Sequence, residues 1–300
     1  MTSRYCLSQA IEAFLRQMAA DGRTPASVGG YQRQLVLLTQ ALGDVPLSRL
    51  TPDRLNGYLI SPAIQLKVDG MPKQTSTING AKSVIRAFFR WCVQTGLLER
   101  NPAAHVRLAV ASTPLTRNMT RMEVGRFLRT IRRARHPLSA RDHALFATLA
   151  YTGIRLSDVI RLHRSDVDLR HRQLVLRRTK GDRRERRYLP ARLSPILTAY
   201  LRARPAVDSN AGEPLFVTQQ GRPLSPRAVQ YRFAFWLRRA GTRKALSVHS
   251  LRHTFGTLLY RATKDLVLVS RALGHRDVKS TQRYAHIDDR ELVRAINGIL

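Results

Sequence analysis

The segment VHSLRHTFGTLLY, residues 248–260, decides the character of the C-terminal part of this chain. Its apolar side chains recur at the spacing of one helix face, at Val248, Leu251, Phe255 and Leu258. This period predicts a helix with one buried side. His249 and Arg252 are three residues apart, so they are neighbours on the surface of that helix.

An arginine beside a histidine suits the binding of a phosphate group. The Arg252 guanidinium is a rigid fork of donors that matches phosphate oxygens, and His249 can donate to the same phosphate or move a proton. Two alternatives stay open: an ordinary surface pair, and a metal site at His249 and His253, which are four residues apart. The guanidinium between the two histidines disfavours the metal, because it would repel a divalent cation.

The residues that follow place a tyrosine near these cations. A short apolar helix should end at Gly274 in a left-handed cap, which puts His275 on the turn and Tyr284 on a further short helix. A phenol with a pKa of ~10 is a poor nucleophile at neutral pH, but nearby cations favour the phenolate. Tyr284 is therefore a candidate nucleophile, and an ordinary half-buried tyrosine is the alternative.

Two upstream segments add an arginine and a lysine. Arg155 closes the stretch YTGIR at a helix–turn boundary, where Asp158 could pair with an arginine and hold it. Lys180 falls on a polar turn between residues 174–176 and 188–189, which predict a β-hairpin. A lysine at a hairpin tip can enter a groove and protonate a departing oxygen. The alternative for Arg155 is an ordinary surface arginine, and the alternative for Lys180 is one more contact to a backbone phosphate.

The charge of the chain points to nucleic acid. The 300 residues carry a net charge of +32, and such an excess needs a polyanion as partner. Residues 107–300 contain 40 basic and 14 acidic residues, whereas residues 1–106 contain 12 basic and six acidic residues. The second part should therefore make most phosphate contacts. The two cysteines predict neither a disulfide nor a metal site. The absence of a long apolar run or signal segment predicts a cytoplasmic protein without a membrane partner.

Apolar periodicity divides the chain into three segments. Residues 1–106 predict four helices with apolar faces. Residues 107–119 lose the periodicity and are expected to form an exposed linker. Residues 120–300 begin with the capping pattern TRME and combine helices with the hairpin. The expected fold is mainly α (α+β): a four-helix N-terminal domain and a mostly helical second domain with a small β-hairpin or sheet.

One helix of the second domain should present a basic face. It starts at Ser225 and Pro226, and its apolar face is opposite a row of arginines: Arg227, Arg232, Arg238 and Arg239. Such faces are often merely solvated. On a chain of this charge we expect this face to contact DNA.

Taken together, these segments resemble the tyrosine recombinases, also called the phage integrase family, and most closely the Xer-like two-domain type. The matching boxes are YTGIRLSD at 151–158, TKG at 179–181, HSLRH at 249–253, LGH at 273–275 and YAH at 284–286. The resemblance covers nearly the whole chain. One departure is Asp158, where the family usually has glutamate.

The resemblance implies that these side chains surround one phosphodiester. Tyr284 would attack the scissile phosphate, form a 3′-phosphotyrosyl bond and free a 5′-hydroxyl. Arg155 and Arg252 would clamp the non-bridging oxygens in the transition state. A second strand's 5′-hydroxyl would then reverse the step, so that strands are exchanged.

The resemblance also assigns the remaining roles and the partners. Lys180 would be the general acid for the leaving oxygen, His249 would assist proton transfer with the tyrosine, and His275 would donate to the phosphate. No metal or other cofactor is implied. The partner would be double-stranded DNA, bound between a core-binding domain and a catalytic domain by a homo-tetramer, or by a hetero-tetramer with a related recombinase, at the nucleoid. Residues 288–300 would dock on a neighbouring subunit or, alternatively, pack on their own domain.

The favoured function is site-specific recombination, for integration or excision of a mobile element or for resolution of chromosome dimers. A topoisomerase of type IB shares the same chemistry without a partner subunit, and a DNA-binding protein without catalysis is the third alternative. The six candidate catalytic residues argue against the third. The DNA target site is not encoded in any pattern of the sequence.

Overall fold

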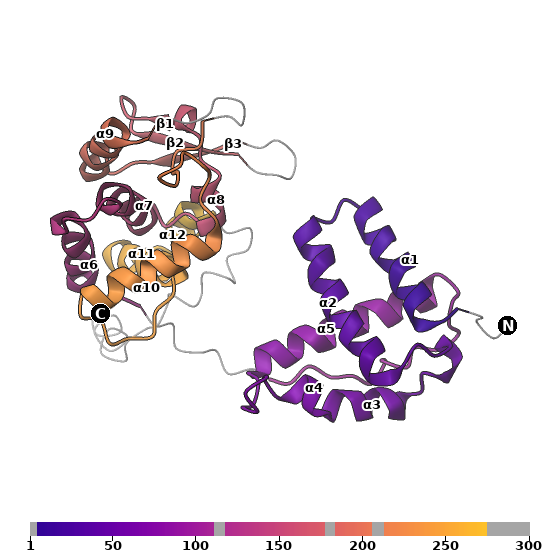
Figure 1. Cartoon of the computed structure of the whole chain (residues 1–300). Helices are drawn as coiled ribbons and strands as arrows, with labels where there is room; N and C mark the ends of the chain where they lie inside the picture. Colours follow the sequence, from indigo (N-terminus) through magenta and orange to yellow (C-terminus); the bar gives the residue numbers. More distant parts are fainter. Residues whose placement is uncertain (1–4, 111–117, 178–183, 206–212, 275–300) are drawn as a thin grey trace, which may run out of the picture. The chain divides into compact units, whose positions relative to one another are not determined.

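The computed structural model describes residues 5–110, 118–177, 184–205 and 213–274 (Figure 1). The chain forms two compact units, Met1–Pro114 and Leu115–Leu300, each built around its own hydrophobic core. Within the described ranges, no helix has both the length and the apolar character needed to cross a membrane.

Unit 1 is helical. Its elements are α1 (Leu7–Ala20), α2 (Pro25–Leu42), the 3₁₀ helix η1 (Leu47–Arg49), α3 (Pro52–Ile60), α4 (Pro62–Gln65) and α5 (Thr75–Gln94). The four predicted helices correspond to α1, α2, α3 and α5, and the short α4 was not predicted. Both α2 and α3 begin with a threonine cap followed by proline, a combination that satisfies a free N–H and presets the first helical φ.

Aromatic rings fill the core of unit 1. The ring of Phe14 lies 5.6 Å from that of Phe88 and 5.3 Å from that of Trp91, measured between centroids. Phe88 and Phe89 are fully buried. Phe88 and Phe89 therefore stabilise the fold and are not available to stack on bases.

Unit 2 combines helices with one small sheet. Its helical elements are α6 (Arg121–Arg133), α7 (Ser139–Thr152), α8 (Leu156–Ile160), η2 (Arg164–Asp166), η3 (Ala191–Leu193), α9 (Ser194–Ala203), α10 (Pro226–Arg239), α11 (His249–Thr263) and α12 (Leu266–Leu273). The predicted mainly helical fold with a small sheet is confirmed. α8 ends at Ile160, and Leu162 and Arg164 form main-chain hydrogen bonds with Leu215 and Glu213.

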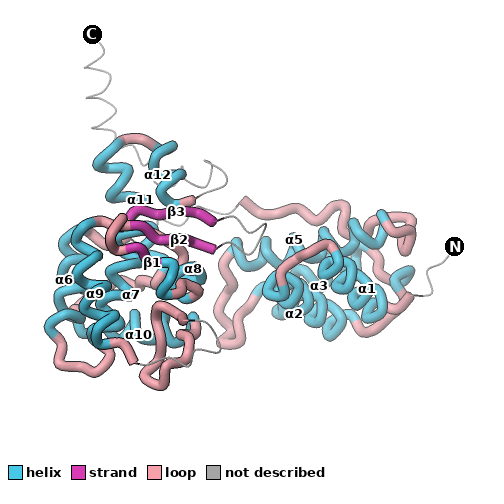
Figure 2. Tube along the Cα trace, turned by 90° about the horizontal axis from the view of Figure 1, so that it is seen from above, coloured by secondary structure: helices cyan, strands magenta, loops and turns pink. Residues whose placement is uncertain are grey.

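The sheet has three antiparallel strands in the order β1 (Val167–Asp168), β2 (Gln173–Arg177) and β3 (Arg184–Tyr188), as Figure 2 shows. The predicted hairpin corresponds to β2 and β3, with Leu174 opposite Arg187 and Leu176 opposite Glu185. Both leucines are buried, so one face of β2 packs on the helical core. The two-residue β1 was not predicted.

α7 is the central helix of unit 2. It packs against α6, α9 and α11, and nine of its residues are buried. The rings of Phe127 on α6, Phe146 on α7 and Phe233 on α10 form a cluster with centroid separations of 5.3 to 5.6 Å. α6 starts with the predicted capping box, in which Thr120 and Glu123 exchange hydrogen bonds between side chain and main chain. This rigid core carries the candidate site at one end of α7.

Candidate active site

Arg252 is the best-defined residue of the candidate site. It lies on α11, and only 4% of its surface is exposed. Its Nη1 donates to the carbonyl oxygen of Gly153 at 2.7 Å, and its Nη2 donates to that of Leu273 at 2.8 Å. One guanidinium therefore joins α11 to the C-terminal ends of α7 and α12, and so connects three of the segments singled out in the sequence.

Gly153 permits this close packing. It ends α7 in the left-handed conformation, with φ of 62° and ψ of 14°. A Cβ atom at this position would lie 2.4 Å from Cδ1 of Phe255 and 3.0 Å from a methyl carbon of Leu273. Only glycine satisfies both the positive φ and the space. Gly274 ends α12 in the same conformation, which confirms the predicted cap.

His249 and His253 lie on the same helix as Arg252. His249 is the first residue of α11 and is exposed, and His253 is half-buried. Their rings are nearly perpendicular, with centroids 4.8 Å apart. The N-terminal turn of a helix favours an anion, because its free N–H groups and its dipole both attract negative charge. In the part of the chain that the structure describes, no group of three or more His, Cys, Asp or Glu side chains gathers as a metal-binding set.

Arg155 lies two residues beyond Gly153, on the same turn. It is half-buried and caps the start of α8, where its carbonyl oxygen accepts from the N–H groups of Asp158 and Val159, each at 3.0 Å. The side chain of Asp158 does pair with an arginine, but that partner is Arg161, the residue directly after α8, at 3.1 Å. Among the described residues, the ion pair of Asp158 is therefore with Arg161 and not with Arg155.

Two threonines that sequence reasoning missed hold α11 in place. The hydroxyl of Thr254, which is 2% exposed, accepts from the main-chain N–H of Met119 at 2.9 Å. The hydroxyl of Thr257 accepts from the Asn118 side chain at 2.8 Å. These contacts join residues 135 and 139 positions apart, so no local pattern could have revealed them.

The basic face predicted for α10 divides into two groups. Arg227, Arg238 and Arg239 are exposed. Arg232 is not, because its Nε donates to Asp142 at 2.6 Å and its side chain is only 13% exposed. The expectation that all four arginines share one exposed face is corrected for Arg232: pairing with a buried carboxylate turns this side chain inward.

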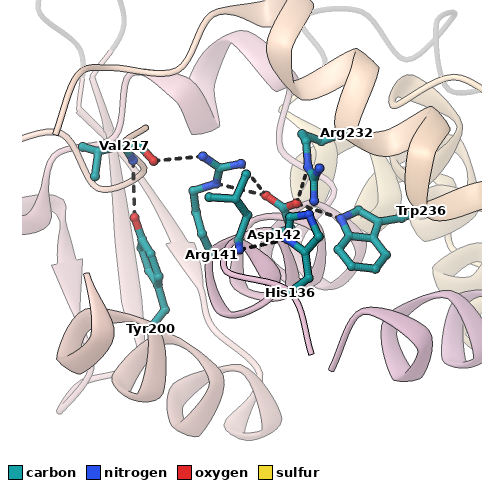
Figure 3. Close-up of polar contacts among 8 residues, drawn as sticks. His136, Arg141, Asp142, Tyr200, Val217, Arg232 and Trp236 are labelled. Carbon is teal, nitrogen blue, oxygen red and sulfur yellow. Dashed lines mark hydrogen bonds and ion pairs between the residues drawn. The ribbon is translucent and has the colours of Figure 1, made fainter. Parts of the chain in front are cut away.

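Asp142 is the centre of a buried polar cluster, shown in Figure 3. Its side chain is fully buried. Its Oδ1 accepts from Nε and Nη2 of Arg141 at 3.0 and 2.7 Å, and its Oδ2 accepts from Arg232 and from Nε1 of Trp236 at 2.7 Å. Desolvation and the Arg232 charge lower the pKa of the neighbouring His136. The cluster fixes α7 to α10 and accounts for the burial of two arginines.

Three predicted catalytic residues, Lys180, His275 and Tyr284, lie outside the described residues, as does the segment 288–300. Of the others, the structure ties Arg252 to the turn that carries Arg155, and it places His249 at the start of the same helix as Arg252. It therefore brings together the segments that carry Arg155, His249 and Arg252.

Comparison with known proteins identifies the family. Residues 117–291 match the sequence profile of the phage integrase family. The chain belongs to this family. It is 33% identical over 295 residues to tyrosine recombinase XerC of Alcanivorax borkumensis, with 97% of this chain and 93% of that protein covered. It is 29% identical to XerC of Proteus mirabilis over 97% of this chain and 94% of the relative.

Solved structures of integrases and recombinases share the fold. The Tn1549 transposon integrase in complex with circular intermediate DNA aligns with a TM-score of 0.77 at 19% identity, covering 97% of this chain and 99% of that one. The XerH recombinase bound to its palindromic difH substrate aligns with a TM-score of 0.75 at 22% identity, covering 97% and 84%. At sequence identities this low, the structural likeness is evidence for the fold alone.

Proposed function

We propose that this chain is a tyrosine-type site-specific DNA recombinase. The observation that carries the proposal is the anchoring of Arg252 between the ends of α7 and α12, which assembles the arginine boxes of the family around one guanidinium. Relatives named tyrosine recombinases over nearly the full length of the chain support it.

The proposed reaction is a transesterification at one phosphodiester. The phenol oxygen of Tyr284 attacks the phosphorus, the bond to the 5′ oxygen breaks, and a 3′-phosphotyrosyl ester replaces it. Arg155 and Arg252 stabilise the negative charge that builds on the non-bridging oxygens. The burial of Arg252 strengthens this effect, because solvent screens a buried charge less.

Proton transfer falls to the remaining three residues. Lys180 protonates the departing 5′ oxygen, which would otherwise leave as an alkoxide. His249 assists loss of the tyrosine proton, and His275 donates to a phosphate oxygen. The ester keeps the energy of the broken bond, so a 5′-hydroxyl of another strand can displace the tyrosine and complete the exchange without a cofactor.

Double-stranded DNA is the proposed partner. The Tn1549 integrase and XerH structures contain DNA, and the net charge of +32 fits a polyanion. We assign DNA contacts to Arg227, Arg238 and Arg239, which are exposed on α10. Residues 1–106 would form the core-binding domain, 107–119 the linker and 120–300 the catalytic domain of a recombinase that acts as a tetramer, alone or with a related recombinase, at the nucleoid.

Covalent capture tests the proposal. The purified chain is incubated with fragments of the genome that encodes it, the mixture is denatured, and DNA that remains attached to protein is recovered and sequenced. We expect DNA joined through its 3′ end, and we expect Tyr284→Phe to abolish this product while DNA binding stays nearly unchanged.

The matched control is Tyr231→Phe, which removes the hydroxyl of an exposed tyrosine on α10. This variant should form the covalent product normally. A product that persists in Tyr284→Phe, or breaks with free 3′ ends, would contradict the mechanism. The captured sequences also distinguish a mobile element from the resolution of joined chromosomes.

A further inference from the structure

A hollow of about 610 Å³ lies between α6, α7 and α9. It reaches Tyr151, the first residue of the box that carries Arg155, but none of the described candidate catalytic residues lines it. In Figures 1 and 2, α6 and α9 lie on one side of unit 2, whereas α8 and α12, which bear on the candidate site, lie on the other. Its volume falls within the range of pockets that bind ligands, and nothing in the proposed reaction uses it.

The floor of this hollow is apolar. Leu128, Pro195 and Ile196 line it, together with the rings of Tyr151 and Tyr200. Leu128 and Tyr200 are buried, and the hydroxyl of Tyr200 is occupied because it donates to the carbonyl of Leu215 and accepts from the N–H of Val217. Such a floor gains free energy from an apolar side chain and little from a phosphate group.

The rim of the hollow is basic. Arg129, Arg132 and Arg192 line it and are exposed. None of the three pairs with a carboxylate among the residues that the structure describes, and none of the described lining residues is acidic. The guanidinium of Arg192 lies over the ring of Tyr151, 5.2 Å from its centroid, and thus closes one wall.

The hollow also contains a histidine that responds to local charge. His143 lines it and is half-buried. Desolvation and the Arg132 charge lower its pKa, so at neutral pH it stays uncharged beside the arginines. An anion placed at this rim would offset the effect of the Arg132 charge and so raise the pKa of His143.

We propose that this hollow is a docking site for a short acidic segment of a partner protein, with a bulky apolar side chain that enters between flanking carboxylates. Charge complementarity with three arginines selects an acidic occupant, and the apolar floor selects a peptide over DNA. The phosphates of a duplex lie on a convex, fully polar surface and would leave the floor empty. A partner held at α6 and α9 can be bound at the same time as DNA at the candidate site.

Fluorescence anisotropy with a synthetic peptide tests the proposal on the full-length chain without DNA, so the outcome does not depend on recombination. The probe is a fluorescein-labelled peptide of sequence EDELFDED, and its control is EDESSDED, which keeps the charge and lacks the apolar pair. We expect the probe to bind, and the control to bind at least about tenfold more weakly, because only the first fills the floor.

Charge reversal locates the site. Arg129→Glu with Arg132→Glu should weaken binding by about tenfold or more, since both rim charges become repulsive. The matched control is Arg126→Glu with Arg133→Glu, which changes the charge of the same helix equally at exposed positions that do not line the hollow. This control should change the affinity by less than about twofold at physiological salt, where distant exposed charges are screened.

Two further variants keep the test decisive if the first does not fold. Ala199→Trp fills the hollow without a change in charge, and Arg192→Glu reverses the rim from another element; both should prevent binding. A rise in the His143 pKa on addition of the probe, followed by NMR, would support the assignment.

Four results would overturn the proposal. The first two are an equal loss of probe affinity in both double variants and equal affinity for the two peptides. The third is displacement of the probe by short duplex DNA as effectively as by unlabelled probe, and the fourth is tighter binding of a peptide with the sequence of residues 288–300. The third would make the hollow part of the DNA surface, and the fourth would make its occupant the chain itself.

Discussion

Two arginines of unit 2 with little exposed surface have different hydrogen-bond partners. Arg252 is 4% exposed and donates to two main-chain carbonyl oxygens, those of Gly153 and Leu273. The side chain of Arg232 is 13% exposed and donates to the carboxylate of Asp142. Among the contacts between described residues, main-chain dipoles hold the guanidinium of Arg252, whereas a formal negative charge holds that of Arg232.

The difference separates an arginine that acts from one that supports the fold. A carbonyl oxygen orients a guanidinium without adding a negative charge, so a guanidinium held by carbonyls can attract a phosphate strongly in a site of low dielectric. A buried carboxylate offsets positive charge and makes the contact a structural tie. The partners of these two arginines among the described residues therefore indicate different roles for them.

The largest effect is expected at Asp142. Asp142→Asn removes the negative charge from between Arg141 and Arg232 and turns an amide N–H₂ toward their donors. Breaking a buried ion pair in this way costs about 3–5 kcal/mol of unfolding free energy. Urea unfolding in a Trp91→Phe background measures it, because Trp236 then reports on unit 2 alone.

Asp166→Asn is the matched control for Asp142→Asn. Asp166 is also buried, but its arginine partner, Arg177, has a side chain that is 56% exposed and can return to water. Its loss of stability should be less than half that of Asp142→Asn. Equal losses would show that burial of the carboxylate alone, without burial of the arginines, determines the cost.

The second effect concerns the reaction. Arg252→Lys keeps a positive charge, but one ammonium cannot reproduce the fork that bridges Gly153 and Leu273. We expect the rate of covalent complex formation to fall by about 10²–10³-fold, the cost of removing one donor to the transition state. The measurement is a single-turnover assay on the DNA recovered by covalent capture.

The same substitution at Arg232 tests the comparison directly. Arg232→Lys should lower the unfolding free energy and leave the rate of the folded protein nearly unchanged, because Arg232 is paired with Asp142 in a structural cluster and is not one of the candidate catalytic residues. If both substitutions slow the reaction equally in folded protein, the distinction between carbonyl and carboxylate partners does not predict the role of a buried arginine.

Local patterns were enough to predict most of the fold. The caps at Thr120 and Gly274 and the helix over residues 248–260 each depend on neighbours within one or two turns, and the structure reproduces them. The pairing of β2 with β3 was likewise visible, because two apolar runs flank a polar turn.

Long-range partners could not be predicted. Nothing near Arg232 in the sequence indicates that it meets Asp142, 90 residues earlier. The same holds for the bond from Arg252 to Gly153, 99 residues away. The family resemblance supplied the expected role of Arg252, but only the structure shows which groups hold it. The roles of Lys180, His275 and Tyr284 remain predictions that the covalent-capture experiment tests.

The smallest effect, and the sharpest test of how Arg252 is positioned, is expected at Gly153. Gly153→Ala forces a Cβ atom to within 2.4 Å of Phe255 at a φ of 62°. Left-handed strain of about 1–2 kcal/mol and overpacking of about 1–3 kcal/mol should together cost about 2–5 kcal/mol of unfolding free energy. Gly241→Ala is the matched control, because Gly241 has a φ of 67° and no atom within 4 Å of the added Cβ, so only the strain applies.

Because the carbonyl of Gly153 accepts from Arg252, Gly153→Ala should also slow covalent complex formation in folded protein, and Gly241→Ala should not. Equal behaviour of the two variants would mean that the packing at Gly153 does not set the position of the guanidinium.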